Sequence, residues 1–265
     1  LKDKKIENFK KNNHFKVVVT FYNPGKTYLE RCLKSIKNQT YSNFDVCIVN
    51  DKSTKEINQI NKLCNYYKKK FGWKYYQSDK NNGPYKSRMN GITNLKPGDE
   101  DIIVLIDGDD ELSNNRVFEN LNKIYQDDTL ITFGNYVNVN ENGIGKPKIR
   151  CKKHNFKKMI EENSFRSYKW IFTHLKTFKY KLYKHINHDT LKKDDEYLKS
   201  ATDIALMYPM LEMSNGRFKC VENVLYKYNR FHPESNNLSK DKLRKQRENA
   251  KYVKSLSKYE PRDNY

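Results

Sequence analysis

The 265-residue sequence has no apolar run long enough for a membrane-spanning helix, which needs about 20 residues. Its basic start, LKDKKIENFKKNN, also lacks the apolar core of a secretory signal. We therefore find neither a helical membrane span nor a signal peptide within these residues. Because the chain begins at Leu1 and not at Met, it can be a fragment of a longer protein.

Cysteine is scarce, and its spacing excludes the common zinc and redox motifs. The five cysteines are scattered, with no CxxC pair among them. Cys32 and Cys47 stand among apolar residues and are expected in the core. The odd count argues for a reducing compartment, so we expect a cytoplasmic or other reducing location.

Three nucleotide- and metal-binding motifs are absent. The stretch NPGKT ends like a P-loop, but the first glycine of that motif would fall at Thr20. No GxGxxG follows the first predicted strand, which argues against dinucleotide binding. An EF-hand starting at Asp107 would have Leu112 where the turning glycine is required.

Acidic residues are outnumbered by basic ones, 32 against 52, and the formal net charge is +20. Such a charge attracts nucleic acid, anionic membrane surfaces or phosphorylated small molecules. The lysines are spread along the chain, however, which favours a solubilising surface. The hydrophobic content of 36% is typical of a folded globular protein.

Strand and helix patterns alternate in the first half of the sequence. Short apolar strands are predicted at residues 15–21, 44–50, 73–77 and 101–106, with helical spacing between them. This alternation predicts an α/β fold with a mostly parallel central sheet covered by helices on both faces. Ligands of such sheets bind at the carboxyl ends of the strands.

The second half is less regular. We predict paired strands at 129–139, a helix at 201–214, two short strands at 217–229, and a polar helix or disordered tail from 238. No internal repeat is present, so we expect one domain with flexible ends.

Polar side chains follow three of the four predicted strands. They are Thr20 and Tyr22 at the end of the first strand, Asp51 after the second, and Asp107, Asp109 and Asp110 after the fourth. Each position alone is weak support, because turns commonly contain Asp, Asn and Gly. Three strand ends that converge on one edge of a sheet favour a ligand site.

The DGDD stretch repels itself unless a cation is bound. Asp107 and Asp109 are separated by one residue, which places two carboxylates on one side of the backbone. Carboxylate oxygens are the ligands that Mg²⁺ and Mn²⁺ prefer, and such an ion can hold a diphosphate. Gly108 would let the backbone approach the ligand closely. The alternative is an acidic surface turn.

These segments resemble a known family. The stretch VVVTFYN…YLERCLKSIKNQTYSNFDVCIVNDKST resembles the opening of the family 2 glycosyltransferases, which have the GT-A fold. NNGPYKSRMNGI is similar to the family's next segment, and IIVLIDGDDEL to its metal-binding Asp-x-Asp strand. ATDIALMYPMLEMSNGRFKCVENVLYKYNRFHPES is similar to the part that carries the acceptor-side base. The resemblance covers roughly residues 15–235.

The resemblance implies a Rossmann-like GT-A domain with a smaller acceptor-side C-terminal part. Its boundaries would be a basic extension at 1–13, a nucleotide-binding half at about 14–126, an acceptor half at about 127–235, and a polar helix or tail at 236–265.

The same resemblance implies the donor-binding residues. Thr20, Tyr22 and Asp51 would contact the uracil and ribose of a UDP-sugar. Arg88 would lie near the nucleotide or the sugar, and Asp110 close to the donor.

Metal and catalytic roles follow from the resemblance in the same way. Asp107 and Asp109 would form the Asp-x-Asp site for Mn²⁺ or Mg²⁺, with Asp109 the more direct ligand. Asp203 would be the general base, although the family often has Glu-Asp where this chain has Thr202 and Asp203. An Asp in the first turn of a helix also simply favours the helix dipole. His232 is a candidate further metal ligand, but a lone histidine is more often structural.

The predicted function is an inverting, metal-dependent transfer of a hexose from a UDP-sugar, such as UDP-glucose or a relative, to a hydroxyl group. The acceptor would belong to a glycan or a protein, hydroxylysine of collagen-like chains included. In-line attack assisted by one base predicts inversion. The Gln-x-x-Arg-Trp of processive members is absent, which favours single additions.

Two alternatives remain open at this point. The chain could be a non-catalytic basic binding module of the same fold that engages nucleic acid or an acidic glycan, although its acidic cluster is intact. Phosphoryl transfer with Asp107 as nucleophile is the weaker alternative, because the Asp-x-Asp would then more typically follow the first strand.

Several basic and aromatic residues have a plain structural explanation as well as a functional one. His174 and Lys176 could line the acceptor or diphosphate site, but a basic face that covers the core is commoner. Trp170 and Tyr168 could stack on a sugar ring, but aromatic residues are usually core residues.

Overall fold

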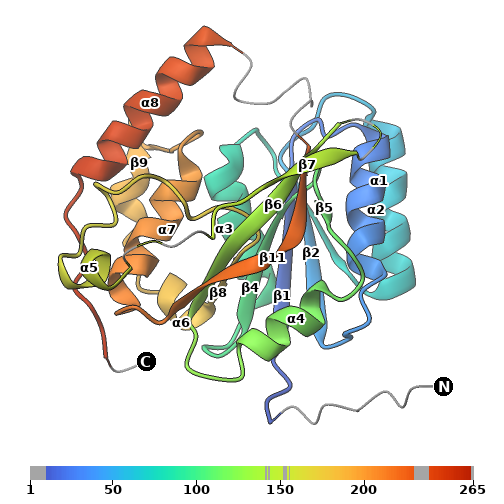
Figure 1. Cartoon of the computed structure of the whole chain (residues 1–265). Helices are drawn as coiled ribbons and strands as arrows, with labels where there is room; N and C mark the ends of the chain where they lie inside the picture. The colour runs from blue at the N-terminus through green and yellow to red at the C-terminus, as the bar shows by residue number, and fades with distance from the viewer. Residues whose placement is uncertain are drawn as a thin grey trace.

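The computed structural model describes residues 10–140, 142, 144–151, 154, 156–229 and 239–263. All but two short strands of these residues form one mixed, mostly parallel sheet with helices on both faces (Figure 1). The predicted α/β fold class is therefore confirmed.

The first half alternates strands and helices, as the sequence predicts. Its elements are β1 (Phe15–Phe21), α1 (Lys26–Lys37), β2 (Phe44–Asn50), α2 (Ile57–Phe71), β3 (Lys74–Gln77), α3 (Gly83–Leu95), β4 (Ile102–Asp107), β5 (Glu111–Leu112) and α4 (Val117–Ile124). Four of the strands lie parallel in the order β3-β2-β1-β4. All four predicted strands are present, and only β3 and β4 differ by one residue at their ends.

Side chains that alternate along β1 divide the core between the two faces of the sheet. Val17 and Val19 belong to the cluster that contains the buried residues of α1, α2 and α4. Val18 belongs to the cluster on the other face, with residues of α3. Figure 1 shows α1 and α2 on the right of the sheet and α3 on its left. Because both faces are covered, the parallel strands are apolar at nearly every position.

The second half extends the same sheet. Its elements are β6 (Ile131–Val139), β7 (Gly145–Lys148), α5 (Phe156–Glu161), β8 (Lys176–Lys179), α6 (Tyr180–Tyr183), a 3-10 helix (His188–Leu191), β9 (Lys192–Lys193), β10 (Glu196–Tyr197), α7 (Thr202–Met213), β11 (Phe218–Asn229) and α8 (Lys240–Ser255). The full strand order is β3-β2-β1-β4-β8-β6-β11-β5, with β7 beside β6. β8 lies antiparallel between β4 and β6, and it joins the two halves.

Two predicted strand pairs are single strands. β6 is one strand, and its hairpin partner is β7. β11 is also one strand, with a shift of register against β6 between Val221 and Tyr226. Within that shift, Asn135 Nδ2 donates a hydrogen bond of 2.6 Å to the Glu222 carbonyl. The break expected between two short strands at 217–229 is therefore an irregularity inside one strand.

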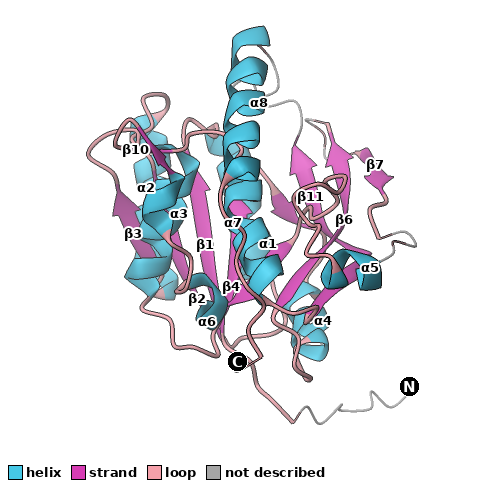
Figure 2. Cartoon of the chain, turned by 90° about the vertical axis from the view of Figure 1, so that its left-hand side faces the viewer, coloured by secondary structure: helices cyan, strands magenta, loops and turns pink. Residues whose placement is uncertain are grey.

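The lysine-rich tail forms α8, and a buried ion pair fixes its C-terminal end. Arg166 Nε lies 2.5 Å from Glu212 Oε1, and the exposed fractions of these side chains are 6% and 0%. Arg166 also donates to the carbonyl oxygens of Val253 and Leu256. Figures 1 and 2 both show the other end of α8 extending beyond the sheet.

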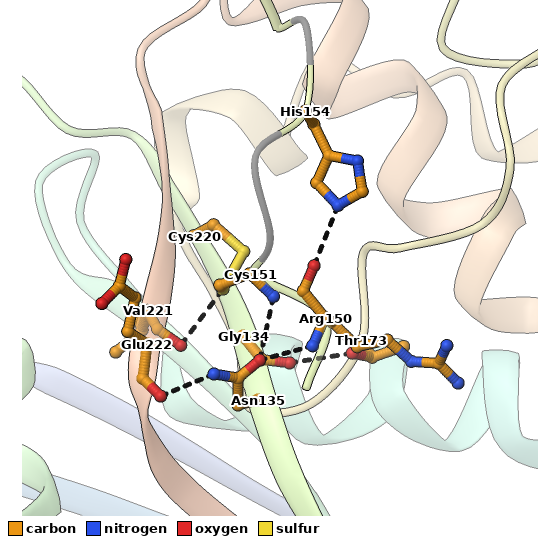
Figure 3. Close-up of a disulfide and its surroundings, with 9 residues drawn as sticks. All are labelled: Gly134, Asn135, Arg150, Cys151, His154, Thr173, Cys220, Val221 and Glu222. Carbon is orange, nitrogen blue, oxygen red and sulfur yellow. Dashed lines mark hydrogen bonds between the residues drawn. A yellow bond between two sulfur atoms is a disulfide. The ribbon is translucent and has the colours of Figure 1, made fainter. Parts of the chain in front are cut away.

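A disulfide joins Cys151 to Cys220, which lies on β11 (Figure 3). Asn135 Oδ1 accepts hydrogen bonds from the backbone N–H groups of Arg150 and Cys151, so the chain that follows β7 is held against β6 as well. The other three cysteines are free and buried, as expected for Cys32 and Cys47. The sequence did not indicate the disulfide between Cys151 and Cys220. Disulfides persist mainly in oxidising compartments, so the bond argues against the expected reducing location, which stays untested.

In the part of the chain that the structure describes, no helix is both long enough and apolar enough to cross a membrane.

Candidate active site

A cavity of about 660 Å³ opens at the carboxyl ends of the parallel strands. Seven of the residues predicted from the sequence line it, namely Thr20, Tyr22, Asp51, Arg88, Asp107, Asp109 and Asp203. These residues come from β1, the chain after β2, α3, the end of β4 and the start of α7. The fold therefore brings together groups that are up to 183 positions apart in sequence (from Thr20 to Asp203).

Asp51 fixes the start of α3 as well as lining the cavity. It is only 3% exposed, and its carboxylate oxygens accept hydrogen bonds from the backbone N–H groups of Asn82 (2.9 Å) and Gly83 (2.8 Å). Gly83 has a φ of 82°, and a Cβ there would lie 2.7 Å from Lys199 Cγ, so a side chain would be strained at this position. Thr20 is buried, whereas Tyr22 is 37% exposed at the mouth of β1.

Arg88 connects the strand end to α7. One terminal nitrogen of its guanidinium lies 3.0 Å from Asp107 Oδ1, and the other lies 3.1 Å from Asp203 Oδ1 and 3.1 Å from Thr202 Oγ1. The Arg88 side chain is 8% exposed, so these contacts are formed largely out of water. The Arg88 guanidinium therefore links Asp107, a predicted metal ligand, to Asp203, the predicted general base.

Asp107 and Asp109 both face the cavity, as the Asp-x-Asp prediction requires. Burial, together with the nearby charge of Asp107, raises the pKa of Asp109 to about 7. Gly108 serves packing, because a Cβ there would lie 2.8 Å from Phe21 Cβ. Two crowded carboxylates form a donor set that fits a hard divalent cation, and such a cation would relieve their repulsion.

The described residues contain no group of three His, Cys, Asp or Glu side chains that could hold a metal by themselves. The further ligand predicted from the sequence, His232, lies outside the described residues. Asp107 and Asp109 would therefore hold a cation together with oxygen ligands supplied from elsewhere, such as a diphosphate.

Asp110 does not line the cavity, in contrast to its predicted place close to the donor. It is 1% exposed, and its carboxylate accepts hydrogen bonds from the Tyr226 hydroxyl (2.8 Å) and the Asn229 backbone N–H (2.7 Å). Burial and the neighbouring aspartates raise its pKa well above the ordinary value. In this structure Asp110 fastens the end of β4 to β11, and its position does not support a direct donor contact.

Asp203 stands at the first turn of α7 with a cation at each carboxylate oxygen. Arg88 contacts Oδ1, and Lys176 Nζ lies 3.2 Å from Oδ2. Burial alone would raise the pKa of Asp203, but the charges of Lys176 and Arg88 hold it well below the ordinary value. The side chain is still 35% exposed, so the charged carboxylate reaches the cavity.

His174 lines the cavity beside the ion pair of Asp203 and Lys176. Lys176 itself is buried and does not line the cavity. The His174 ring stacks on Tyr226 at 4.6 Å between centroids and on Tyr228 at 5.4 Å. Burial and the charge of Lys176 lower the pKa of His174 to about 3, so its ring is neutral. The expectation of a basic face that merely covers the core was wrong for His174, which lines the cavity, whereas Lys176 is buried and pairs with Asp203.

A further wall of the cavity comes from residues outside the strand ends. It includes Trp170, Lys199 and Ile204, and α8 contributes Leu243, Gln246, Arg247 and Ala250. Trp170 is held edge-on by Phe172 and Tyr208, whereas Tyr168 does not line the cavity. The sequence predicts a polar helix or a disordered tail here, and nothing in it indicates which surface such a helix would face.

The sequence model of the family described as Glycosyl transferase family 2 matches residues 16–187, more than half of the chain. The chain belongs to glycosyl transferase family 2. A 125-residue stretch is 31% identical to Glycosyltransferase GlyA of Streptococcus pneumoniae and covers 47% of this chain and 17% of that protein. A 121-residue stretch is 31% identical to an uncharacterized glycosyltransferase of Haemophilus influenzae and covers 45% and 46% of the two chains. The matched stretches thus span less than half the length of each relative.

Solved structures of this family's fold are also similar. The structure of S. aureus TarS 1-349 in complex with UDP-GlcNAc matches with a TM-score of 0.64 and 20% identity, over 93% of this chain and 68% of that chain. GalNAc-T7 with UDP, GalNAc and Mn²⁺ matches with a TM-score of 0.60 and 16% identity, over 90% and 48%. At these identities the likeness concerns the fold alone, and it confirms the predicted GT-A fold.

Proposed function

We propose that the protein is a metal-dependent, inverting glycosyltransferase that moves a hexose from a UDP-sugar to a hydroxyl acceptor. One observation carries this proposal. Carboxylates suited to a divalent cation, an arginine and a further aspartate from α7 face one cavity at the carboxyl edge of the sheet. Family membership supports the transfer chemistry, and the cavity supplies the residues for it.

The donor would lie along the strand ends. Thr20, Tyr22 and Asp51 would contact uracil and ribose, and Arg88 would stabilise the phosphates. Asp107 and Asp109 would hold Mn²⁺ or Mg²⁺, which when bound offsets the negative charge of the leaving diphosphate. UDP-glucose or a relative is the proposed donor, and UDP-GlcNAc, the ligand of the TarS structure, is such a relative.

The acceptor would enter between the strand ends and the wall formed by Trp170 and α8. Its hydroxyl oxygen forms a bond to the anomeric carbon while the bond from that carbon to the diphosphate breaks. The electron pair of that bond leaves with UDP, and Asp203 takes the acceptor's proton. Attack from the face opposite the leaving group gives inversion. The acceptor hydroxyl would belong to a glycan or a protein, hydroxylysine of collagen-like chains included.

The test is release of UDP from a panel of UDP-sugars with Mn²⁺, measured for the wild-type chain and for Asp109→Ala. We expect the variant to lose activity by roughly 100-fold or more, because the charge on the diphosphate is then poorly neutralised. Asp127→Ala is the matched control, since Asp127 is an exposed aspartate that pairs with Lys219. Equal activity in the wild-type chain and Asp109→Ala would reject the metal assignment.

A further inference from the structure

Lys176 is a buried lysine in the middle of the sheet. It begins β8, the strand that joins β4 to β6, and it is 1% exposed. Its ammonium group lies 3.2 Å from Asp203 Oδ2 and 3.2 Å from His174 Nδ1. A lysine charge is almost never fully buried unless it is paired, because moving an ion out of water is energetically costly. Lys176 is therefore placed to act on Asp203.

The geometry shows what Lys176 does to the carboxylate. Arg88 alone could take both oxygens of Asp203 in a two-pronged contact, as guanidinium groups commonly do. Instead, Oδ1 lies at Arg88 and Oδ2 lies at Lys176, so the carboxylate is divided between two cations from different elements. Arg88 then keeps its second terminal nitrogen for Asp107.

His174 completes the arrangement. Its ring stacks on Tyr226 and Tyr228, and Lys176 Nζ lies 3.2 Å from its Nδ1 and 3.5 Å from its Nε2, within hydrogen-bond distance. A neutral histidine can accept this hydrogen bond, whereas a charged one cannot. Lys176 is thus fixed on two sides, and its position fixes that of Asp203.

We propose that Lys176 is a positioning residue for the reaction, which holds the Asp203 carboxylate charged and turned toward the acceptor side of the cavity. This inference rests on the proposed role of Asp203 as the general base. Lys176 does not touch the donor wall formed by Thr20, Tyr22 and Asp51, so it acts on the chemical step rather than on donor binding.

The first experiment compares Lys176→Met with Lys179→Met. Lys179 lies on the same strand with 5% of its side chain exposed, but it pairs with Glu100 outside the cavity. Hydrolysis of UDP-glucose and UDP-GlcNAc with Mn²⁺ is measured, because water then serves as the acceptor. We expect Lys176→Met to lower kcat by roughly 10- to 100-fold with the donor KM within about twofold. Lys179→Met should keep kcat within about twofold, and Lys176→Arg should recover part of the loss.

The second experiment needs no turnover. Melting temperatures are measured for Lys176→Met, Asp203→Asn and the double variant. Asp203→Asn leaves the buried Lys176 charge without its carboxylate partner, and Lys176→Met leaves Asp203 with Arg88 alone. Each single change should therefore lower the melting temperature by roughly 5 to 10 °C. The double variant should lose clearly less than the sum of the two. Additive losses would show that the pair is not formed and would overturn the inference.

The outcomes separate this inference from the proposed function. If Asp203→Asn is inactive while Lys176→Met keeps the wild-type kcat, the positioning role is wrong and the proposed function stands. If kcat and KM change together, or if Lys179→Met loses as much activity as Lys176→Met, the effect is structural and the role is likewise wrong. If the wild-type chain and Asp203→Asn hydrolyse the donors equally, the base assignment fails and the inference fails with it.

Discussion

At the scale of single residues, the site is organised by polar groups that have more than one partner. Arg88 contacts both Asp107 and Asp203, and Asp51 accepts two backbone hydrogen bonds. The strand-end aspartates could be found from the sequence, because an apolar strand that ends in acidic residues is a local pattern. Lys176 was a candidate from the sequence, but its contact with Asp203 could not be predicted, because the two residues are 27 positions apart.

Asp51 tests whether a predicted donor contact also supports the fold. We expect Asp51→Ala to lower the free energy of unfolding by roughly 1 to 3 kcal/mol, because two backbone N–H groups lose their acceptor. UDP affinity should fall as well. Chemical unfolding and calorimetry with UDP are the measurements. Unchanged stability would mean that solvent replaces the carboxylate at the start of α3.

His174 allows a prediction of pH dependence. Burial and Lys176 lower its pKa to about 3, below the ordinary value of about 6.5. On acidification the unfolded chain therefore takes up a proton that the folded chain does not, and stability falls as the pH drops from about 6.5 toward 3.

His174→Gln keeps an acceptor for Lys176 but does not titrate, so it isolates this contribution. Between pH 7 and pH 5, we expect the wild-type protein to lose roughly 1 to 2 kcal/mol more stability than His174→Gln. Urea unfolding at the two pH values measures the difference. Parallel losses in both proteins would show that His174 is protonated normally in the folded chain.

At the scale of elements, strands were predicted best where both faces of the sheet are covered. β1, β2 and β4 are apolar at nearly every position, so their runs stand out. The sequence predicts two short strands at 217–229, where β11 is one strand. Exposed polar residues lie in its middle, and pairing with β6 on both sides of them keeps it continuous. The role of Asp110 could not be predicted for a similar reason. Its carboxylate accepts a hydrogen bond from Tyr226 of β11, and only the folded sheet brings the two residues together.

The disulfide between Cys151 and Cys220 closes a loop with a sequence separation of 69 residues. We expect the double change Cys151→Ser and Cys220→Ser to lower the free energy of unfolding by roughly 2 to 4 kcal/mol, because the unfolded chain gains freedom. Thiol titration of the unfolded, unreduced protein should detect the three free cysteines. Five reactive thiols would show that the bond does not form, and they would favour the reducing location predicted from the sequence.

At the scale of the whole molecule, the net charge of +20 raises the alternative function, a non-catalytic module that binds nucleic acid or an acidic glycan. The aspartates of the cavity argue for a narrower interaction, because they would repel a polyanion and suit a cation-bound diphosphate. We expect binding to a 20-base DNA strand to weaken at least about 10-fold between 50 and 200 mM salt, with UDP binding far less affected. Tight DNA binding with this steep salt dependence, together with no UDP binding, would favour the module instead.

The central claim is that Asp107 and Asp109 become a binding site only when a cation joins them to a diphosphate. Calorimetric titration of UDP, with and without Mn²⁺, tests it most directly. We predict that UDP binds the wild-type chain at least about 10-fold more tightly with Mn²⁺, and that Asp109→Ala abolishes this gain. UDP binding of equal strength with and without the metal, or an undiminished gain in the variant, would contradict the claim.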